Sequence, residues 1–264
     1  MSRRHVTFAC EGTVLYGTLD LPAQGSATGS GLLLVSGGNE PRAGAWNGQA
    51  AMAARLACAG LAVFRFDRRG VGDSEGENRG FRYSADDIAA ALAAFRDEVP
   101  GLKYIYGLGN CDAASALMLG GGCGFDGLIL SNPWTIEETE EAPPPPAVLR
   151  AHYANRLKDP AALLRLLRGK VALGQLVRSL RDLRRPARRS GLAADMAAGL
   201  AGFAGPVVIL LAGRDRTAQA FRADWDRDDP RLLMCPEASH SFVEPAAQAW
   251  LEARVTEAVR TRSG

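Results

Sequence analysis

A sharp strand–turn–helix at residues 103–119 constrains the fold of this chain more than any other feature. A short apolar strand runs into Gly109-Asn110-Cys111-Asp112-Ala113, and a helix of small residues follows at once. So tight a turn leaves no room for large side chains beside its centre, and Gly109 and Ala113 meet that requirement. The pattern is that of the nucleophile elbow, usually written G-x-S-x-G, with cysteine in place of serine. The alternative is a buried structural cysteine at a helix start.

Strands and helices alternate along most of the chain. We expect strands at residues 5–10, 13–21, 32–35, 61–66, 103–106, 127–130, 206–211 and 231–234, and helices at 50–58, 84–99, 217–225 and 245–260, besides the helix after Cys111. Glu11-Gly12 marks a hairpin between the first two strands. Ser84 and Asp87 resemble a capping box for the helix at 84–99. The fold class predicted is α/β, with a doubly wound, mostly parallel, eight-stranded sheet.

The alternation breaks in the middle of the chain. Four of residues 137–141 are glutamates, residues 143–146 are four prolines, and amphipathic helical patterns follow at 161–168 and 174–183. A proline run cannot lie inside a helix. We therefore expect a core formed by residues 1–133 and 205–264, and a helical cap at 134–204 inserted after the sixth strand.

A cysteine in such a turn is a nucleophile only if a base and an acid accompany it. Of the three histidines, His5 lies in the first strand and His152 in the expected cap, which leaves His240, in a loop after the last strand. Asp215 stands at the carboxyl end of the strand at 206–211. The predicted catalytic residues are thus Cys111, Asp215 and His240, in the order that the elbow motif requires. For Asp215 the alternatives are a helix N-cap or an ion-pair partner of Arg214 or Arg216. For His240 the alternative is an ordinary surface position.

Two loops are candidates for stabilising an oxyanion through backbone amides. One donor is expected from Asp112, the residue after the cysteine, and the other from the loop 36–39, where Gly38 is the first candidate and Asn39 the second. The turn at 67–74, Asp-Arg-Arg-Gly-Val-Gly-Asp-Ser, is expected to be structural. It lacks the third glycine of a dinucleotide loop, and Asp73 would repel a phosphate. Ser74 follows the wrong strand for a nucleophile.

With these residues in hand, the chain resembles the α/β-hydrolases over essentially its whole length. More narrowly, it resembles the exosortase A system-associated hydrolase 1 family, on residues 36–39, 64–76, 109–115 and 130–134 and on its arginine-rich cap. The first resemblance implies the α/β-hydrolase fold. The second implies a bacterial setting of exopolysaccharide synthesis and exosortase-type protein sorting.

The sequence indicates a hydrolase in which Cys111 attacks an ester or thioester carbonyl and forms an acyl-enzyme, without cofactor or metal. Acyl transfer by the same residues is the nearest alternative. A non-catalytic binding module with a hydrolase fold is the alternative from another class.

Composition and charge narrow the partners and the compartment. No stretch approaches the ~18 apolar residues of a membrane span. Five scattered cysteines without a C-x-x-C pair fit free thiols in a reducing cytoplasm.

Arg178 and Arg181 belong to a basic cluster in the expected cap, and with Trp134 they are substrate-contact candidates. That cluster is either a solvated helix face or a surface for an anionic or carrier-bound acyl substrate or an acidic membrane. Nucleic acid is not expected, because no aromatic residues interleave with the arginines. The oligomeric state is not predicted.

Overall fold

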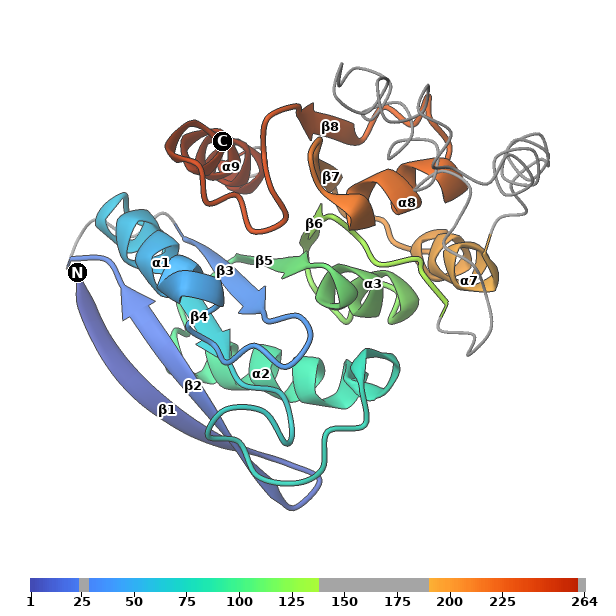
Figure 1. Cartoon of the computed structure of the whole chain (residues 1–264). Coiled ribbons are helices and arrows are strands. Elements are labelled where there is room, and N and C mark those ends of the chain that lie inside the picture. Colours follow the sequence, from blue (N-terminus) through green and yellow to red (C-terminus); the bar gives the residue numbers. More distant parts are fainter. Residues whose placement is uncertain (24–28, 138–189, 261–264) are drawn as a thin grey trace, which may run out of the picture.

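The computed structural model describes residues 1–23, 29–137 and 190–260. Its centre is a sheet with the strand order β1-β2-β4-β3-β5-β6-β7-β8 (Figure 1). The strands are β1 (Ser2–Cys10), β2 (Thr13–Leu21), β3 (Ser30–Val35), β4 (Ala62–Phe66), β5 (Tyr104–Asn110), β6 (Gly127–Ser131), β7 (Val207–Ala212) and β8 (Leu232–Cys235). The pairs β1–β2 and β2–β4 are antiparallel and the other pairs are parallel. The predicted eight-stranded, mostly parallel sheet is confirmed.

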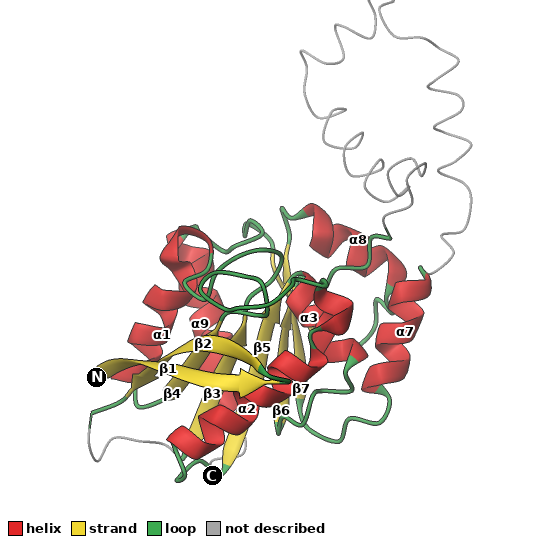
Figure 2. Ribbon diagram, turned by 90° about the horizontal axis from the view of Figure 1, so that it is seen from below, coloured by secondary structure: helices red, strands yellow, loops and turns green. Residues whose placement is uncertain are grey.

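Helices cover both faces of the sheet (Figure 2). The helices are α1 (Gly48–Cys58), α2 (Ala85–Glu98), α3 (Asp112–Leu119), α7 (Gly191–Leu200), α8 (Arg216–Asp224) and α9 (Pro245–Arg260), with short 3-10 segments at Ala45–Asn47 and Phe81–Tyr83. Helices α1 and α9 pack on one face, and α2, α3, α7 and α8 on the other. Because both faces are covered, the central strands are continuous apolar runs.

Two local predictions were wrong. Strand β5 extends to Asn110, beyond the expected end at residue 106, because Gly107 and Gly109 continue the pairing with β3 and β6. The expected capping box is absent as well. Ser84 donates its hydroxyl hydrogen to the Phe81 carbonyl, and the carboxylate of Asp87 accepts from the Arg69 backbone and guanidinium instead.

Helix α7 belongs to the packing of the core, although its sequence falls within the expected cap at 134–204. Leu192, Met196 and Leu200 are buried in the cluster that α3 and β6 help to form. We therefore propose that an inserted cap ends before Ser190. The predicted helices at 161–168 and 174–183, with Arg178, Arg181 and His152, lie outside the described residues. In the described part of the chain, no helix has the length and apolar character needed to cross a bilayer.

The turn after β4 is structural, as expected. The buried carboxylate of Asp67 accepts hydrogen bonds from the backbone amides of Arg42 and Asp73. Gly72 has φ +57°, and a Cβ there would overlap the Asp67 carboxylate. Ser74 donates to the Asp67 carbonyl at 2.7 Å and accepts from the Tyr16 amide. The turn thus ties β4 to β2 and to the loop after β3, and Ser74 is engaged in this structural bonding.

A buried ion pair joins β2 to β4. Arg65 is 3% exposed, and its guanidinium donates to the carboxylate of Asp20, which is 0% exposed. Burial lowers the pKa of Arg65, and the charge of Asp20 opposes that shift. Arg3 shares the same carboxylate at 2.6 Å.

Replacing Asp20 by alanine is expected to destabilise the protein by about 3–5 kcal/mol, because Arg65 would stay buried without its counter-charge. Urea unfolding followed by circular dichroism measures the loss. Asp73→Ala is the matched control: its carboxylate pairs with Arg42 at 2.8 Å but is 65% exposed, so the expected cost is below about 1 kcal/mol. An equal loss of unfolding free energy in the two variants would show that the buried Asp20–Arg65 pair contributes no more to stability than the exposed Asp73–Arg42 pair.

Candidate active site

Cys111 lies at the tight junction between β5 and α3. Its backbone has φ 61° and ψ −126°, a region that residues other than glycine rarely adopt. A Cβ on Gly109 would come within 2.7 Å of the Ala113 carbonyl carbon, and a Cβ on Gly37 within 2.6 Å of the Asn110 carbonyl oxygen. The small residues are therefore sterically required. The junction has the strand–turn–helix form predicted from the sequence, with the cysteine half-buried at its apex.

The structure brings Cys111, Asp215 and His240 together at the carboxyl ends of the parallel strands. Nδ1 of His240 lies 2.9 Å from Oδ2 of Asp215. The ring is also hydrogen-bonded to the side chain of Cys111. Asp215 is at the same time the N-cap of α8, because Oδ2 accepts from the Ala218 amide at 3.0 Å. One carboxylate thus makes both the contact expected of a catalytic acid and the contact of a helix N-cap.

A compact turn fixes the position of His240. The Phe242 amide donates to the Ser239 carbonyl, and Phe242 itself has φ +49°. The Glu244 carboxylate accepts from the Ser239 amide and hydroxyl, each at 3.1 Å. The histidine is thereby held between two anchored ends.

The surroundings of His240 strongly favour its charged form. The hydrogen bonds to Asp215 and Cys111 raise the pKa of His240 to about 10, against the opposing effect of burial. Two thiols away from this site have raised pKa values. Burial raises the pKa of Cys123 to about 11, and burial together with Asp87 raises the pKa of Cys10.

Asn132, to which no chemical role was assigned from the sequence, connects all three segments of the site. Its Oδ1 accepts from the Ala212 amide at 2.8 Å, at the end of β7. Its Nδ2 donates to the His240 carbonyl at 3.0 Å and to Asn110 Oδ1 at 3.2 Å. Asn132 is completely buried and has φ +43°. The sequence signal that could have identified Asn132 is its place at the carboxyl end of a predicted parallel strand. Asparagine tolerates the left-handed backbone that such a sharp turn requires.

These hydrogen bonds also determine which way the amide of Asn110 faces. The Ala212 amide is only a donor and the His240 carbonyl only an acceptor, so the orientation of the Asn132 side chain is forced. Asn110 must then turn Oδ1 toward Asn132 and Nδ2 toward His240, whose Nε2 lies 3.4 Å away. An NH₂ group facing Nε2 favours the neutral ring with its proton on Nδ1. Asn110 therefore opposes the effect of Asp215 on the same imidazole.

The observed contacts of Gly38 differ in one respect from the oxyanion site that the sequence predicts. The Gly38 amide is not free: it donates to Oδ1 of Asp112 at 2.7 Å. Oδ2 of Asp112 lies 3.6 Å from Nη2 of Arg68, whose side chain is 5% exposed. Nη1 of Arg68 is buried and has no hydrogen-bond partner among the described residues. The Asp112 carboxylate thus occupies the Gly38 amide, one of the two predicted oxyanion donors. A sequence motif cannot reveal this contact.

The contacts of Asn39 and Trp134 are made by different parts of each residue. Oδ1 of Asn39 accepts from Asn78 Nδ2 at 2.8 Å, and this contact does not involve the backbone amide for which Asn39 is a candidate. The backbone amide of Trp134 contacts the Ser115 hydroxyl and the Cys111 carbonyl, and its side chain packs against the core. Trp134 therefore supports the back of the turn around Cys111. Among the described residues, no three histidine, cysteine, aspartate or glutamate side chains form a metal site.

Asp215→Asn is expected to lower the pKa of His240 from about 10 toward the ordinary value of 6.5, because the largest cause of the rise is removed. Titration of the histidine ring protons by NMR measures the shift, and His240→Gln identifies the resonance. The wild-type ring should stay protonated at pH 8, whereas the variant ring should be largely neutral. An unchanged titration would mean that Asp215 does not hold the ring in solution.

Asn132→Gly in the Asp215→Asn background is expected to raise the pKa of His240, because Asn110 is then free to turn its oxygen toward Nε2–H. Glycine preserves the left-handed backbone, so the lost side chain is the main change. Asn132→Ala is the comparison: it should show the same pKa shift and about 1 kcal/mol of additional instability from its backbone. A pKa that does not move would remove the orienting role of Asn132.

Comparison with known proteins agrees with this fold and shows the family. Residues 32–253 match the model of the alpha/beta hydrolase family. An esterase from Pyrococcus furiosus superposes with a TM-score of 0.62 at 16% identity, covering 100% of this chain and 91% of that chain. An alpha/beta hydrolase from Penicillium sp. gives 0.65 at 17% identity, covering 98% of each.

A serine hydrolase from Xanthomonas campestris, described as having no lid, gives a TM-score of 0.61 at 15% identity and covers 98% of this chain and 94% of that chain. No curated protein sequence matches. At these identities the solved structures support the fold, and the match over residues 32–253 shows the family. The chain belongs to the alpha/beta hydrolase family.

Proposed function

We propose that this protein cleaves an ester or thioester through a covalent acyl-cysteine intermediate. The observation that carries the proposal is the arrangement of one histidine between two partners. His240 is bonded through Nδ1 to Asp215 at 2.9 Å, and the same ring is hydrogen-bonded to Cys111 at the apex of a strained turn. A nucleophile, a base and a group that orients the base are thus in contact.

In the acylation step, the sulfur of Cys111 forms a bond to the carbonyl carbon, and the carbonyl π electrons move to oxygen. His240 takes the thiol proton of Cys111, and the raised pKa of His240 favours the imidazolium that results. As the tetrahedral intermediate collapses, His240 gives its proton to the departing alcohol or thiol. An acyl thioester on Cys111 remains.

In the second step, neutral His240 takes a proton from water, and the hydroxide oxygen bonds to the acyl carbon. The sulfur leaves, and a carboxylic acid is released. Asp215 holds the ring and offsets its charge in both steps. The backbone amide of Asp112 faces the developing oxyanion, and the Gly38 amide joins it once the Asp112 carboxylate has moved. Nη1 of Arg68, which has no hydrogen-bond partner in the described part of the chain, offers that carboxylate a second binding position.

The narrower features of the proposal rest on the sequence. The resemblance of residues 109–115 and 130–134 to the exosortase A system-associated hydrolase 1 family supports a bacterial exopolysaccharide setting and a cytoplasmic site of action. Arg178 and Arg181, which lie outside the described residues, would bind an anionic or carrier-bound substrate or an acidic membrane surface.

The test is hydrolysis of paired p-nitrophenyl esters and acyl thioesters by the wild type and by Cys111→Ala. Turnover by the wild type should fall at least about 10³-fold in the variant, because the covalent route is lost. Cys58→Ala, at an exposed cysteine, is the matched control and should leave the rate unchanged. A Cys111→Ala enzyme that retains its activity would overturn the proposal.

Asp112→Ala is expected to raise kcat on a neutral ester severalfold, because it frees the Gly38 amide and removes a negative charge from the oxyanion site. Asp112→Asn is the comparison, since its amide oxygen can still accept from Gly38. A lower kcat for Asp112→Ala would show that the carboxylate holds the loop in its working position instead of occupying a donor.

A further inference from the structure

A cavity of about 500 Å³ lies between α1 and α9, beside the candidate active site. Its lining includes Asn110, whose Nδ2 is 3.4 Å from the His240 ring, and Ser241, the next residue after that histidine. Ser131, at the end of β6, contributes a buried hydroxyl without a partner among the described residues. The cavity therefore begins where β5 and β6 end, next to the catalytic histidine.

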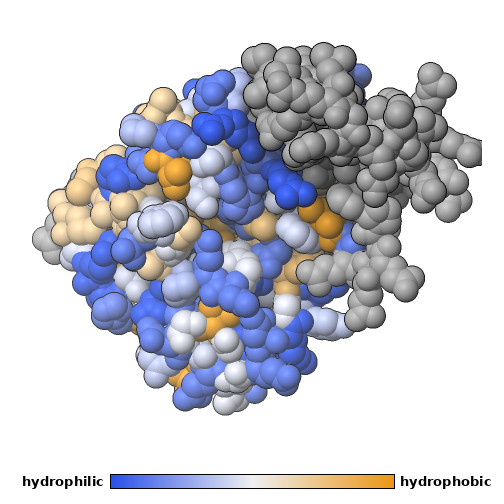
Figure 3. Space-filling view, viewed as in Figure 1, coloured by the Kyte–Doolittle hydropathy of each residue, from blue (hydrophilic) through white to orange (hydrophobic). Residues whose placement is uncertain are grey.

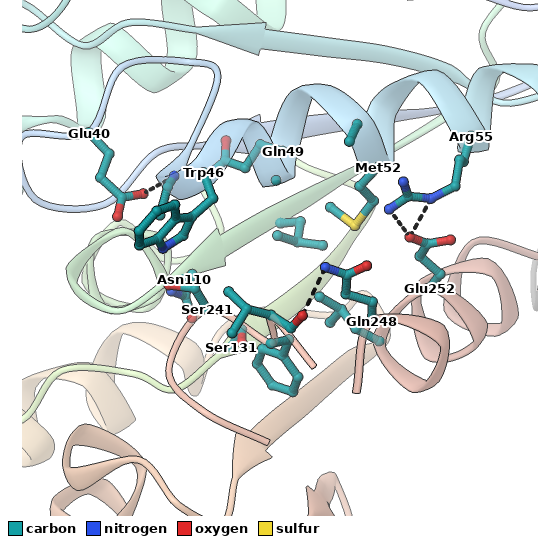
Figure 4. A pocket seen from close by; sticks show the side chains of 17 residues that line it. Glu40, Trp46, Gln49, Met52, Arg55, Asn110, Ser131, Ser241, Gln248 and Glu252 are labelled. Atoms are coloured by element: carbon teal, nitrogen blue, oxygen red, sulfur yellow. Dashed lines mark hydrogen bonds and ion pairs between the residues drawn. The ribbon is translucent and has the colours of Figure 1, made fainter. Parts of the chain in front are cut away.

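The floor of the cavity is apolar. Met52, Leu108 and Phe242 are nearly buried, and Leu251 of α9 faces them from the opposite wall. Figure 4 shows the Met52 side chain pointing into the space between the two helices. A cavity of this volume is in the range that holds a small organic ligand, and such a lining favours a hydrocarbon.

The mouth of the cavity exposes further apolar surface. Trp46 is 89% exposed and Val243 is 44% exposed, and both line the opening. Trp46 and Asn47 both have positive φ, so a strained backbone presents the indole. A pale orange patch also lies over α1 in the space-filling view (Figure 3). Hydrophobic surface thus continues from the outside into the cavity.

An ion pair closes the far end. The guanidinium of Arg55 on α1 bonds the carboxylate of Glu252 on α9, and both residues line the cavity and also the open groove beyond it. Arg55 is neutralised by this partner, so it is not available to an anion. The carboxylate of Glu40 at the mouth would repel an anionic ligand. The charges therefore favour an uncharged chain.

We propose that the cavity between α1 and α9 binds an unbranched aliphatic chain of the substrate, of medium length; this inference rests on the proposed ester or thioester cleavage. From Gln49 to Arg55 the α1 wall is about 9 Å long, at ~1.5 Å per helical residue. An extended chain advances roughly 1.3 Å per carbon, since C–C bonds are near 1.5 Å. About seven carbons fill the wall before the Arg55–Glu252 pair stops the chain.

The experiment compares two series of neutral esters with the wild type, from two to twelve carbons, one varied in the acyl chain and the other in the alcohol. In the series that uses the cavity, kcat/KM should rise up to about fourfold per carbon as each methylene is buried, and fall beyond about eight carbons. The series that responds identifies which part of the ester enters. A flat profile in both series would overturn the proposal.

Two variants locate the effect in the cavity. Ala51→Phe fills it from an exposed position of α1, and should lower kcat/KM for the eight-carbon ester at least tenfold with little change for the acetate. Ala249→Phe, exposed on α9 and outside the lining, is the matched control. Arg55→Ala opens the far end and should move the optimum to longer chains. Equal responses to both phenylalanines would place the chain elsewhere.

Binding without turnover separates this inference from the proposed function. Octanol binding to Cys111→Ala, measured by calorimetry, should be weakened by Ala51→Phe and not by Ala249→Phe. If the wild type hydrolyses the acetate ester but octanol does not bind, the cavity proposal fails and the proposed function stands. If octanol binds as expected and no ester is cleaved in a Cys111-dependent way, the proposed function fails instead.

Discussion

The arrangement of the site depends most on the hydrogen bonds of the Asn132 side-chain amide. Completely buried, it bonds the end of β7, the carbonyl of His240 and the side chain of Asn110. Each bond reaches a different segment of the candidate site: the strand that precedes Asp215, the histidine loop, and the residue before Cys111. Three strands of a parallel sheet end side by side, and nothing in the sheet pairing alone sets their loops in register. The Asn132 amide links these three loops, because its donors and its acceptor lie at fixed positions.

The same network places opposing influences on the imidazole and on the oxyanion site. Asp215 and Cys111 favour a charged His240, whereas the NH₂ group of Asn110 favours a neutral one. The carboxylate of Asp112 accepts from the Gly38 amide next to the buried guanidinium of Arg68. In the proposed reaction, substrate must alter this arrangement, because the oxyanion and the Asp112 carboxylate compete for the Gly38 amide. Polar groups in such contact are coupled, and their effects on reactivity are not additive.

Much of the fold follows from the sequence because local patterns determine it. The apolar runs of the central strands, the hairpin at Glu11-Gly12 and the small residues around Cys111 each reflect a physical need that the structure confirms. Other features depend on distant partners. Strand β5 passes through Gly107 and Gly109 because β3 and β6 pair with them, and Asp87 binds Arg69 instead of capping α2. The order of Cys111, Asp215 and His240 was readable from their places at strand ends. The bond between Asp112 and Gly38, and the hub at Asn132, were not, because side-chain direction is set by tertiary packing.

The most direct test of covalent catalysis by Cys111 is to identify the atom that carries the acyl group during turnover. The wild type would be mixed with a p-nitrophenyl ester, quenched in acid within the first turnover, digested and analysed by mass spectrometry. We expect a burst of p-nitrophenol and an acyl group on the peptide that contains Cys111, and hydroxylamine should remove that group as it removes a thioester. An acyl group on another residue, or turnover with a burst and no adduct on Cys111, would show that Cys111 is not the nucleophile.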